Sequence, residues 1–232
     1  MSAIPRRDFA DPAALADALA RSVAQSLAEA VAARGTALLA LSGGSTPADF
    51  LRRLGALPLA WDRVVVTPVD ERWVAADSPR SNARMIGQTL LSGAAAGARF
   101  VGMTDGAQTP EAGLAEVEAR IAALPWPADV LTLGMGEDGH TASWFPGADG
   151  LDEAAAADAP THVRAIRAPG APEPRITLTG RAVLSARRIV LQIEGAAKRA
   201  TLAAAEAPGP WQAMPIRAVL RGAPALEIWS GG

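Results

Sequence analysis

Short apolar segments alternate with helical segments along most of the chain, and this alternation limits the folds that the sequence can adopt. Strands that are apolar on both faces and separated by helices are typical of a mostly parallel sheet. We therefore predict an α/β fold with a Rossmann-like, mostly parallel sheet and helices on both faces. Six segments are continuous, apolar and bounded by turn residues, as buried strands are: 36–41, 63–70, 99–103, 129–134, 187–193 and 225–230.

The helices are marked by their ends as well as by their pattern. Asp11 and Pro12 are a cap and a first helical residue, Gly35 is a stop signal, and apolar residues recur every fourth position between them. Further helices are predicted over 47–54, 81–91, 195–205 and from residue 110 onward. The Pro-, Gly- and Ala-rich segment 150–175 interrupts the rhythm, and we expect a surface excursion there. Because the alternation resumes after it, we predict one domain over 1–232.

Composition excludes several classes of function. The formal net charge is −2, and no basic face suited to nucleic-acid phosphates is evident, so no nucleic-acid partner is expected. There is no cysteine, which excludes disulfides and thiolate chemistry. No apolar run approaches membrane-spanning length, so we expect no membrane partner and a cytoplasmic protein. The oligomeric state has no sequence signature, and a monomer is our working expectation.

The sequence has 22 lysine and arginine residues in total, and Lys198 is the only lysine. Elsewhere the chain uses arginine for positive charge. A lone lysine under that bias suggests a site that suits a compact ammonium group better than a planar guanidinium. The alternative is chance placement on a helix surface, and composition does not decide between the two.

A glycine- and hydroxyl-rich turn, "SGGSTP", follows the first predicted strand. Gly43 and Gly44 allow backbone conformations closed to other residues, and Ser45 adds a hydroxyl donor. We expect Thr46 to cap the next helix, with Asp49 completing a capping box. The free N–H groups of that helix then face the turn and form an anion site suited to a phosphate. The alternative is a plain, well-capped turn.

Charged residues follow the second predicted strand. Asp70, Glu71 and Arg72 lie at its carboxyl end, where ligands collect in parallel sheets. The downstream segment "SPRSNARM" adds polar side chains that can face the same crevice. On this evidence alone, ordinary surface residues are the favoured interpretation.

The loop "GMGEDGHTASWFPG" follows the strand at 129–134 and contains the spelling G-x-G-x-x-G. A dinucleotide-binding turn would open a sustained helix, but proline and glycine follow too soon here, so that interpretation fails. The loop instead displays His140 at the end of a strand, where an imidazole can act as a general base near neutral pH. Asp138 either orients that ring or holds a backbone turn. His162 lies in the irregular segment and is assigned no role.

Taken together, these loops resemble the 6-phosphogluconolactonase family, within the wider superfamily of glucosamine/galactosamine-6-phosphate isomerases. The matching motifs occur in the family's order and spacing from about residue 38 onward: "SGGSTP", "DER", "SN", "GMGEDGHTASWFPG", "RITLT" and "GAAKR". The resemblance implies a sugar-phosphate isomerase-like fold. It also implies hydrolysis of 6-phospho-D-glucono-1,5-lactone, a small-molecule substrate of the oxidative pentose phosphate pathway, without metal or organic cofactor.

The resemblance also implies roles for individual residues. His140 would deprotonate the attacking water. Asp70 would either position the histidine or bind sugar hydroxyls, and Arg175 would either contact the anion or begin a structural turn. The substrate's phosphate would be held by the glycine-rich turn and three cations: Gly43, Gly44, Ser45, Thr46, Arg72, Arg175 and Lys198.

Two competing functions are open at this point. Amino-sugar-phosphate deaminases and isomerases of the same superfamily typically have Asp-Glu-Tyr where this chain has Asp-Glu-Arg, and Asn-Glu-Pro where it has Trp144-Phe145-Pro146. This chain thus lacks their glutamate at that place. Trp144 also departs from the lactonases, in which a smaller aliphatic residue is usual. The other competitor is a sugar-phosphate sensor without turnover, but such proteins normally carry a DNA-binding helix pair and a basic cluster.

Overall fold

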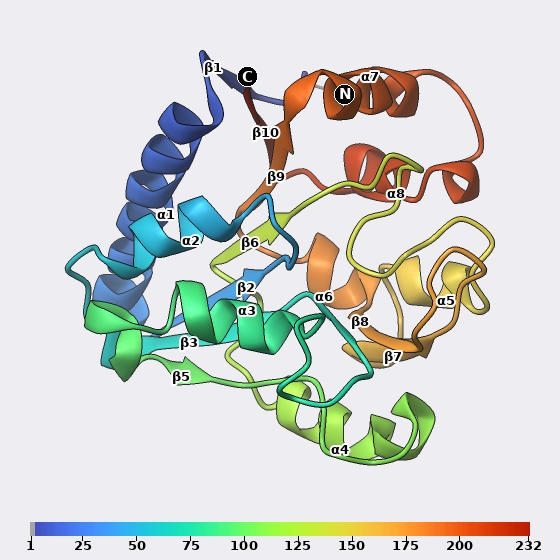
Figure 1. Cartoon of the computed structure of the whole chain (residues 1–232), viewed down its shortest axis with the longest axis horizontal. Coiled ribbons are helices and arrows are strands. Elements are labelled where there is room, and N and C mark those ends of the chain that lie inside the picture. The colour runs from blue at the N-terminus through green and yellow to red at the C-terminus, as the bar shows by residue number, and fades with distance from the viewer. Residues whose placement is uncertain (1–2) are drawn as a thin grey trace.

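The computed structural model describes residues 3–232 and contains a large parallel sheet and a smaller antiparallel one (Figure 1). All neighbouring strands of the large sheet run parallel, so the mostly parallel sheet predicted from the sequence is confirmed. Its seven strands are, in spatial order, β1 (Arg6–Phe9), β10 (Leu226–Gly231), β9 (Ile189–Glu194), β6 (Val130–Leu133), β2 (Ala37–Leu41), β3 (Val64–Pro68) and β5 (Arg99–Phe100).

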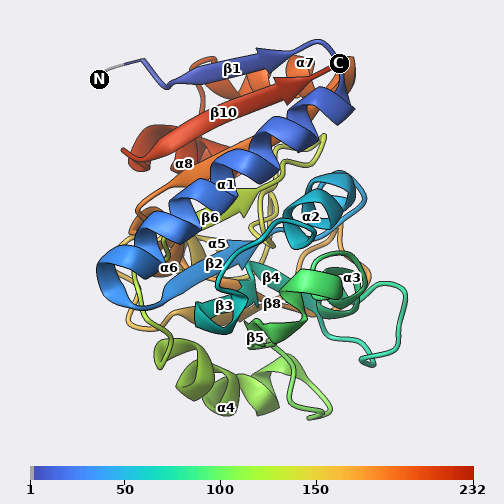
Figure 2. The ribbon, with the colours of Figure 1, turned by 90° about the vertical axis from the view of Figure 1, so that its left-hand side faces the viewer.

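Helices cover both faces of this sheet, as predicted. Leu39 and Val66 point into a core shared with α1, α2 and α3, whereas Leu38 and Val65 point into a second core on the opposite face. Figure 2 shows α1 lying across the first face. The helices are α1 (Pro12–Arg34), α2 (Ala48–Gly55), α3 (Asn82–Thr89), α4 (Pro110–Ala122), α5 (Leu151–Ala155), α6 (Gly180–Leu184), α7 (Gly195–Glu206) and α8 (Ile216–Gly222), with short 3-10 turns η1 (Trp61–Arg63), η2 (Gly93–Gly97) and η3 (Trp211–Ala213).

The small sheet was not predicted. It pairs β4 (Asp70–Arg72), β8 (Arg175–Leu178) and β7 (Val163–Ile166) in antiparallel fashion. The segment 150–175, expected to be an irregular excursion, contains α5, β7 and the first residue of β8. These elements are four or five residues long and lie among proline and glycine, so they leave no readable periodicity.

The segment predicted as a single strand over 63–70 is divided between the two sheets. β3 ends at Pro68 and β4 begins at Asp70. Val69 joins them, because its N–H donates to the carbonyl of Leu41 in the large sheet and its own carbonyl accepts from Leu178 in the small sheet. This switch carries Asp70 off the end of β3 and places it beside β8.

The helix ends agree with the predictions in one case and differ in another. Asp11 caps α1 by accepting from the N–H of Ala14 at 2.8 Å, and Gly35 ends the helix with φ of 76°. The capping expected of Thr46 and Asp49 at α2 is wrong: Pro47 takes the cap position, and Asp49 pairs with arginines of its own helix. The short edge strand β1 was also missed, because its residues are mostly exposed and charged.

Candidate active site

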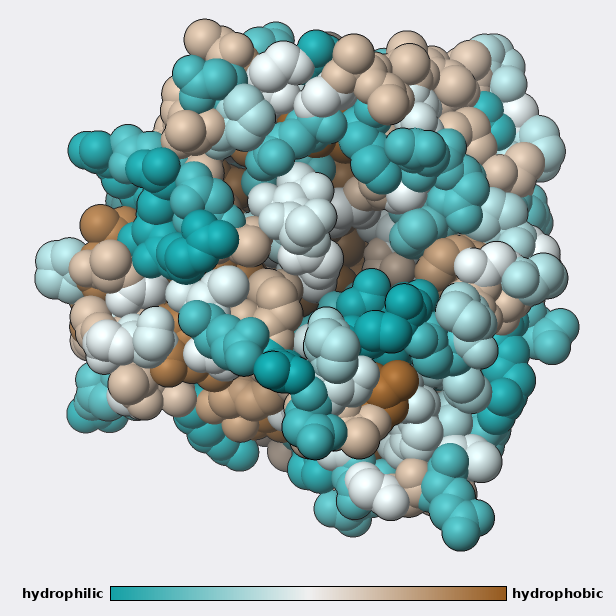
Figure 3. Space-filling view, in the orientation of Figure 1, coloured by the Kyte–Doolittle hydropathy of each residue, from teal (hydrophilic) through white to brown (hydrophobic). Residues whose placement is uncertain are grey.

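Loops that follow four neighbouring strands meet at one cavity of about 200 Å³. The strands β9, β6, β2 and β3 are adjacent in the sheet, and their carboxyl ends point to the same edge. Figure 3 shows the molecule hollowed near the centre of this face, with hydrophilic residues around the rim. The cavity is lined by Ser42, Gly43, Gly44, Thr46, Pro47, Asp70, Arg72, Asn82, Gly134, Met135, Gly136, His140, Ala142, Arg175, Gln192, Glu194 and Lys198.

His140 reaches the cavity with one ring nitrogen held by a carboxylate. Its Nδ1 lies 2.6 Å from Oδ1 of Asp138, which also accepts the His140 backbone N–H at 3.0 Å. The ring stacks on Phe145 with centroids 4.2 Å apart, and its side chain is 31 % exposed. With the Nδ1 proton donated to Asp138, Nε2 presents a lone pair. The arrangement suits a general base.

Asp138 makes both contacts that the sequence left open, since its Oδ1 lies against the imidazole Nδ1 and accepts the backbone N–H of the turn. Burial opposes its ionisation, but the hydrogen bonds and charge of His140 outweigh burial and lower the pKa of Asp138 below its usual value. The side chain therefore stays ionised around neutral pH, where a negative charge stabilises the imidazolium that forms when His140 takes up a proton.

The glycines of this loop make room for the imidazole instead of for a pyrophosphate. A methyl group on Gly136 would lie 2.1 Å from Nδ1 of His140. Gly139 has φ of 77°, a left-handed conformation that favours glycine, and its N–H closes the turn onto the carbonyl of Gly136. The second and third glycines of the G-x-G-x-x-G spelling are thus explained by the packing and turning of a histidine loop.

The predicted anion turn borders the same cavity, with two differences from expectation. Gly44 has φ of 100°, as expected of a glycine-dependent turn, but Gly43 has no positive φ, so its conformation is open to other residues. Ser45 is exposed and does not line the cavity, whereas Ser42, at the end of β2, does. Thr46 lines the cavity as expected.

Two arginines lie opposite each other on neighbouring strands of the small sheet. Arg72 on β4 is the register partner of Arg175 on β8, and both line the cavity. Burial lowers the pKa of Arg175 below its usual value, and the charge of Arg72 acts in the same direction. Like charges placed directly opposite are unfavourable unless an anion offsets them. Part of this positive charge is offset by Asp70, whose Oδ2 lies 3.6 Å from Nη1 of Arg175, and Arg175 begins strand β8 instead of a turn.

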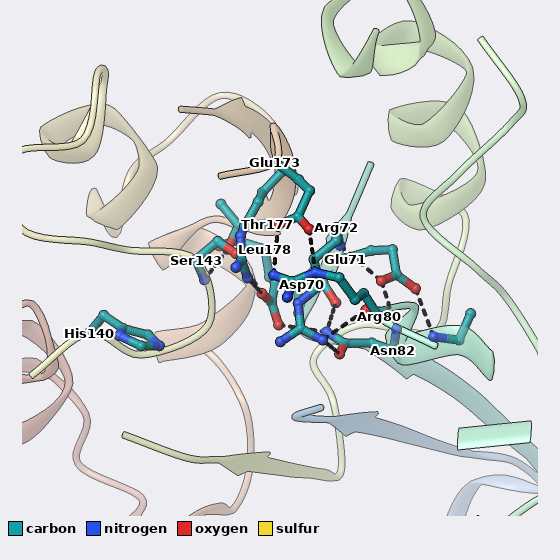
Figure 4. Close-up of polar contacts among 12 residues, drawn as sticks. Asp70, Glu71, Arg72, Arg80, Asn82, His140, Ser143, Glu173, Thr177 and Leu178 are labelled. Carbon is teal, nitrogen blue, oxygen red and sulfur yellow. Dashed lines mark hydrogen bonds and ion pairs between the residues drawn. The ribbon is translucent and has the colours of Figure 1, made fainter. Parts of the chain in front are cut away.

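Asp70 does not position the histidine. It is 5 % exposed and accepts hydrogen bonds from Ser143 Oγ and from Asn82 Nδ2, the latter at 3.2 Å, while Nη1 of Arg175 lies 3.6 Å from its Oδ2. Figure 4 shows this cluster apart from the His140 ring. Of the two carboxylates considered from the sequence, Asp138 contacts the imidazole, and Asp70 lies in the cavity wall beside Arg175.

Lys198 lies in the first turn of α7 and enters the cavity beside residues that the sequence did not bring to notice. Its Nζ donates to the carbonyl of Met135 at 2.6 Å. Gln192 and Glu194, at the end of β9, line the same cavity and are joined by a hydrogen bond of 2.7 Å. Burial raises the pKa of Glu194, and the negative charge of Asp49 adds to this. No sequence signal separates this glutamate from a surface residue.

Neither a cluster of metal-ligating side chains nor a helix that could span a membrane occurs in the part of the chain that the structure describes. Within residues 3–232, His, Asp and Glu side chains form no group of three or more that could hold a metal ion. Over the same range, every helix is too short or too polar to cross a bilayer.

Comparisons with known proteins identify the family and the fold of this chain. The family model of glucosamine-6-phosphate isomerases/6-phosphogluconolactonase matches residues 10–228. The 6-phosphogluconolactonase of Rhizobium meliloti is 51 % identical, over 95 % of this chain and 96 % of the relative, and that of Pseudomonas putida is 42 % identical over 94 % and 90 %. The crystal structure of a 6-phosphogluconolactonase from Shewanella baltica superposes with a TM-score of 0.96 at 38 % identity and covers 99 % of both chains. The resemblance inferred from the sequence motifs is confirmed.

Proposed function

The chain belongs to the family of glucosamine-6-phosphate isomerases and 6-phosphogluconolactonases, and we propose that it acts as a 6-phosphogluconolactonase, a hydrolase that converts 6-phospho-D-glucono-1,5-lactone to 6-phosphogluconate. One observation carries the proposal beyond family membership. A carboxylate-held imidazole and three basic side chains, Arg72, Arg175 and Lys198, line a single cavity. A lactone with a phosphate tail needs this combination of a general base and an anion seat.

His140 starts the reaction by taking a proton from water. The water oxygen bonds to the lactone carbonyl carbon as Nε2 accepts the proton, and the carbonyl oxygen becomes an oxyanion. The bond from that carbon to the ring oxygen then breaks, and the imidazolium returns its proton to the departing oxygen. The products are a carboxylic acid and a hydroxyl group, so atoms and charge balance. A δ-lactone is an activated ester, so no covalent intermediate on the protein is required.

The phosphate tail orients the substrate from the side of the cavity formed by the glycine-rich turn. This side is bordered by Gly43, Gly44 and Thr46. Lys198 supplies a mobile cation that exchanges its bond to the Met135 carbonyl for a bond to a phosphate oxygen. Fixing the ring this way turns the attack of water into a step between pre-positioned groups. Arg72 and Arg175 add positive charge beside the anion.

The deaminase alternative has weaker support at the residue level. Ring-opening deamination needs a further carboxylate near the histidine. Trp144 is fully buried and donates its indole N–H to the carbonyl of Leu178, while Phe145 stacks on His140. Neither side chain can relay a proton as a carboxylate does.

Turnover of freshly prepared 6-phosphogluconolactone tests the proposal. We expect the purified protein to accelerate lactone loss well above spontaneous hydrolysis, measured by pH-stat and corrected for the uncatalysed rate. Glucosamine-6-phosphate should release no ammonia under the same conditions. A rate equal to the background together with tight binding of 6-phosphogluconate would identify a sensor, and ammonia release would identify a deaminase.

Glu194 predicts a particular pH dependence of phosphate binding. Because burial raises its pKa, its carboxyl group is neutral at low pH and gains a negative charge as the pH rises through that raised value. The new charge lies in the wall of an anion site and repels the phosphate, so KM should increase with pH. The side chain in Glu194→Gln stays neutral. This variant should therefore have a KM for the lactone about 3- to 10-fold lower than that of the wild type at the highest pH measured.

The comparison between the two proteins isolates the charge of Glu194, because the carboxyl group at this position is the only titratable group that the substitution removes. The measurement is KM against pH for the wild type and for Glu194→Gln, with the two curves meeting at low pH. Parallel curves over the whole range would show that Glu194 does not face the bound phosphate.

A further inference from the structure

We infer that Asn82 is a positioning residue that holds the anion turn, Asp70 and Arg72 as one unit, so that none of the three can move without the others. The inference rests on the proposed function for the ligand that these groups hold. Asn82 is the only asparagine in the sequence, as Lys198 is the only lysine, and both side chains line the cavity.

The carboxamide of Asn82 joins an acid to a base. Its Nδ2 donates to the backbone carbonyl of Asp70 at 2.8 Å and to Oδ1 of the same residue at 3.2 Å. Its Oδ1 accepts from Nη1 of Arg72 at 2.7 Å, and the residue is 2 % exposed (Figure 4). An asparagine presents a donor and an acceptor from one rigid plane, and leucine or aspartate of similar size lacks one or both.

The same carboxamide lies against the anion turn. This contact explains why residue 43 is a glycine, which the backbone conformation at that position does not explain. A methyl group on Gly43 would lie 1.9 Å from Oδ1 and 2.6 Å from Nδ2 of Asn82, although Gly43 has no positive φ. At Gly44 the backbone conformation favours glycine, because φ is 100°, whereas an added methyl group would have no atom within 4 Å. Gly43 is thus required by the side chain of Asn82, and the turn packs directly on it.

Asn82 resists such a collision, because its carboxamide is held by the hydrogen bonds to Asp70 and Arg72 and its backbone is anchored as well. It is the first residue of α3, and its N–H donates to Oε1 of the buried Glu71 at 2.7 Å. The next N–H, from Ala83, donates to the other oxygen of the same carboxylate at 2.7 Å. Ser81 caps the helix and also donates to Glu71. The buried glutamate therefore fixes Asn82, and Asn82 fixes the groups that face the ligand.

The kinetic test compares Asn82→Ala with the wild type. Loss of the carboxamide should raise KM for the lactone, and the dissociation constant of 6-phosphogluconate, by about 10- to 100-fold, the scale of one or two lost charge-assisted hydrogen bonds. The drop in kcat should be smaller, and the pH midpoints of kcat should stay in place because His140 and Asp138 are untouched. A merely structural role would lower the folded fraction and leave KM of the active molecules unchanged, which would overturn the inference.

A double-mutant cycle tests the linkage to the turn. In the wild-type background, Gly43→Ala should weaken 6-phosphogluconate binding by about 10-fold or more and lower the midpoint of thermal unfolding. In the Asn82→Ala background the same change should cost less than about 3-fold, because the colliding amide is gone. Asn82→Asp keeps the shape and should leave the collision in place. Gly87→Ala, in α3 with open space around it, is the control for replacing a glycine.

The result of the double-mutant cycle does not depend on whether the proposed lactonase activity is correct. Wild-type turnover reports on the lactonase activity, whereas unfolding midpoints and binding of 6-phosphogluconate or inorganic phosphate need no turnover. If the cost of Gly43→Ala is the same in both backgrounds, Asn82 does not hold the turn and the inference fails, whatever the activity of the wild type.

Discussion

Replacing His140 with alanine is expected to lower kcat for lactone hydrolysis by about 10²- to 10⁴-fold, the usual contribution of a general base. The affinity for 6-phosphogluconate should stay nearly intact, because the cations and the glycine-rich turn that we propose to hold the phosphate are unchanged. The measurement is initial rates with fresh lactone together with calorimetric binding of the product. Both are needed, since loss of rate with loss of binding would indicate a damaged cavity.

The chain supplies its own control for this variant. His162, the other histidine, lies outside the cavity, contacts Glu118 through Nδ1 at 3.2 Å and stacks on Trp126. His162→Ala should leave kcat and KM per folded molecule at their wild-type values, with unfolding midpoints to correct for stability. If His140→Ala retained wild-type turnover after correction for spontaneous hydrolysis, the role of general base would be wrong.

Replacing Lys198 with alanine is expected to raise KM by about 10- to 100-fold with a smaller effect on kcat. In the proposed function the ammonium binds the remote phosphate equally in the ground state and in the transition state, and removing uniform binding changes KM. Lys198→Arg should recover only part of this loss, since a planar guanidinium does not fit a seat shaped for a compact ammonium. The measurement is saturation kinetics for the three proteins at one pH.

Arg199 is the matched control for the loss of charge. It follows Lys198 in α7 but is exposed and bonds to the carbonyls of Gly231 and Gly232, away from the cavity. Arg199→Ala removes one positive charge and should change KM by less than about 2-fold, as expected for a distant exposed charge in salt. A large loss of kcat at unchanged KM in Lys198→Ala would place the ammonium at the reacting carbonyl instead of the phosphate.

The parts of the fold that the sequence predicted are those with local signals. Continuous apolar runs marked the six interior and flanking strands, and Asp11 with Gly35 marked the ends of α1 correctly. The strands β4 (Asp-Glu-Arg) and β7 (Val-Arg-Ala-Ile) contain charged residues and form no continuous apolar run. The small sheet was therefore missed, and with it the cross-strand pairing that sets Arg72 against Arg175.

The residues of the candidate site likewise include some that the sequence made identifiable and some that it did not. His140 and Lys198 were identifiable because each is scarce in the sequence and follows a strand. Gln192 and Glu194 reach the cavity because β9 lies beside β6 in the sheet, and nothing next to them in sequence indicates this. The choice between Asp70 and Asp138 as the partner of the histidine also needed coordinates, because both follow strands whose ends meet.

The N-terminus of α2 shows that residue types and spacing alone do not ensure that a capping box forms. Thr46 and Asp49 have the right types and spacing for a capping box, but the helix begins one residue later than the motif requires. Asp49 then faces Arg52 and Arg53 one turn along, where ion pairs at i+3 and i+4 compete with the cap. The turn before α2 forms without that cap, with Gly44 in a conformation that favours glycine.

A crystal structure with bound 6-phosphogluconate tests the central claim most directly, that one cavity holds the phosphate at the Gly43–Thr46 turn and presents the reacting carbon to His140. We predict phosphate oxygens within hydrogen-bonding distance of the turn N–H groups and of Lys198 Nζ, with the product carboxylate beside Nε2 of His140. A phosphate bound elsewhere, or a carboxylate on the far side of the cavity from the imidazole, would contradict it.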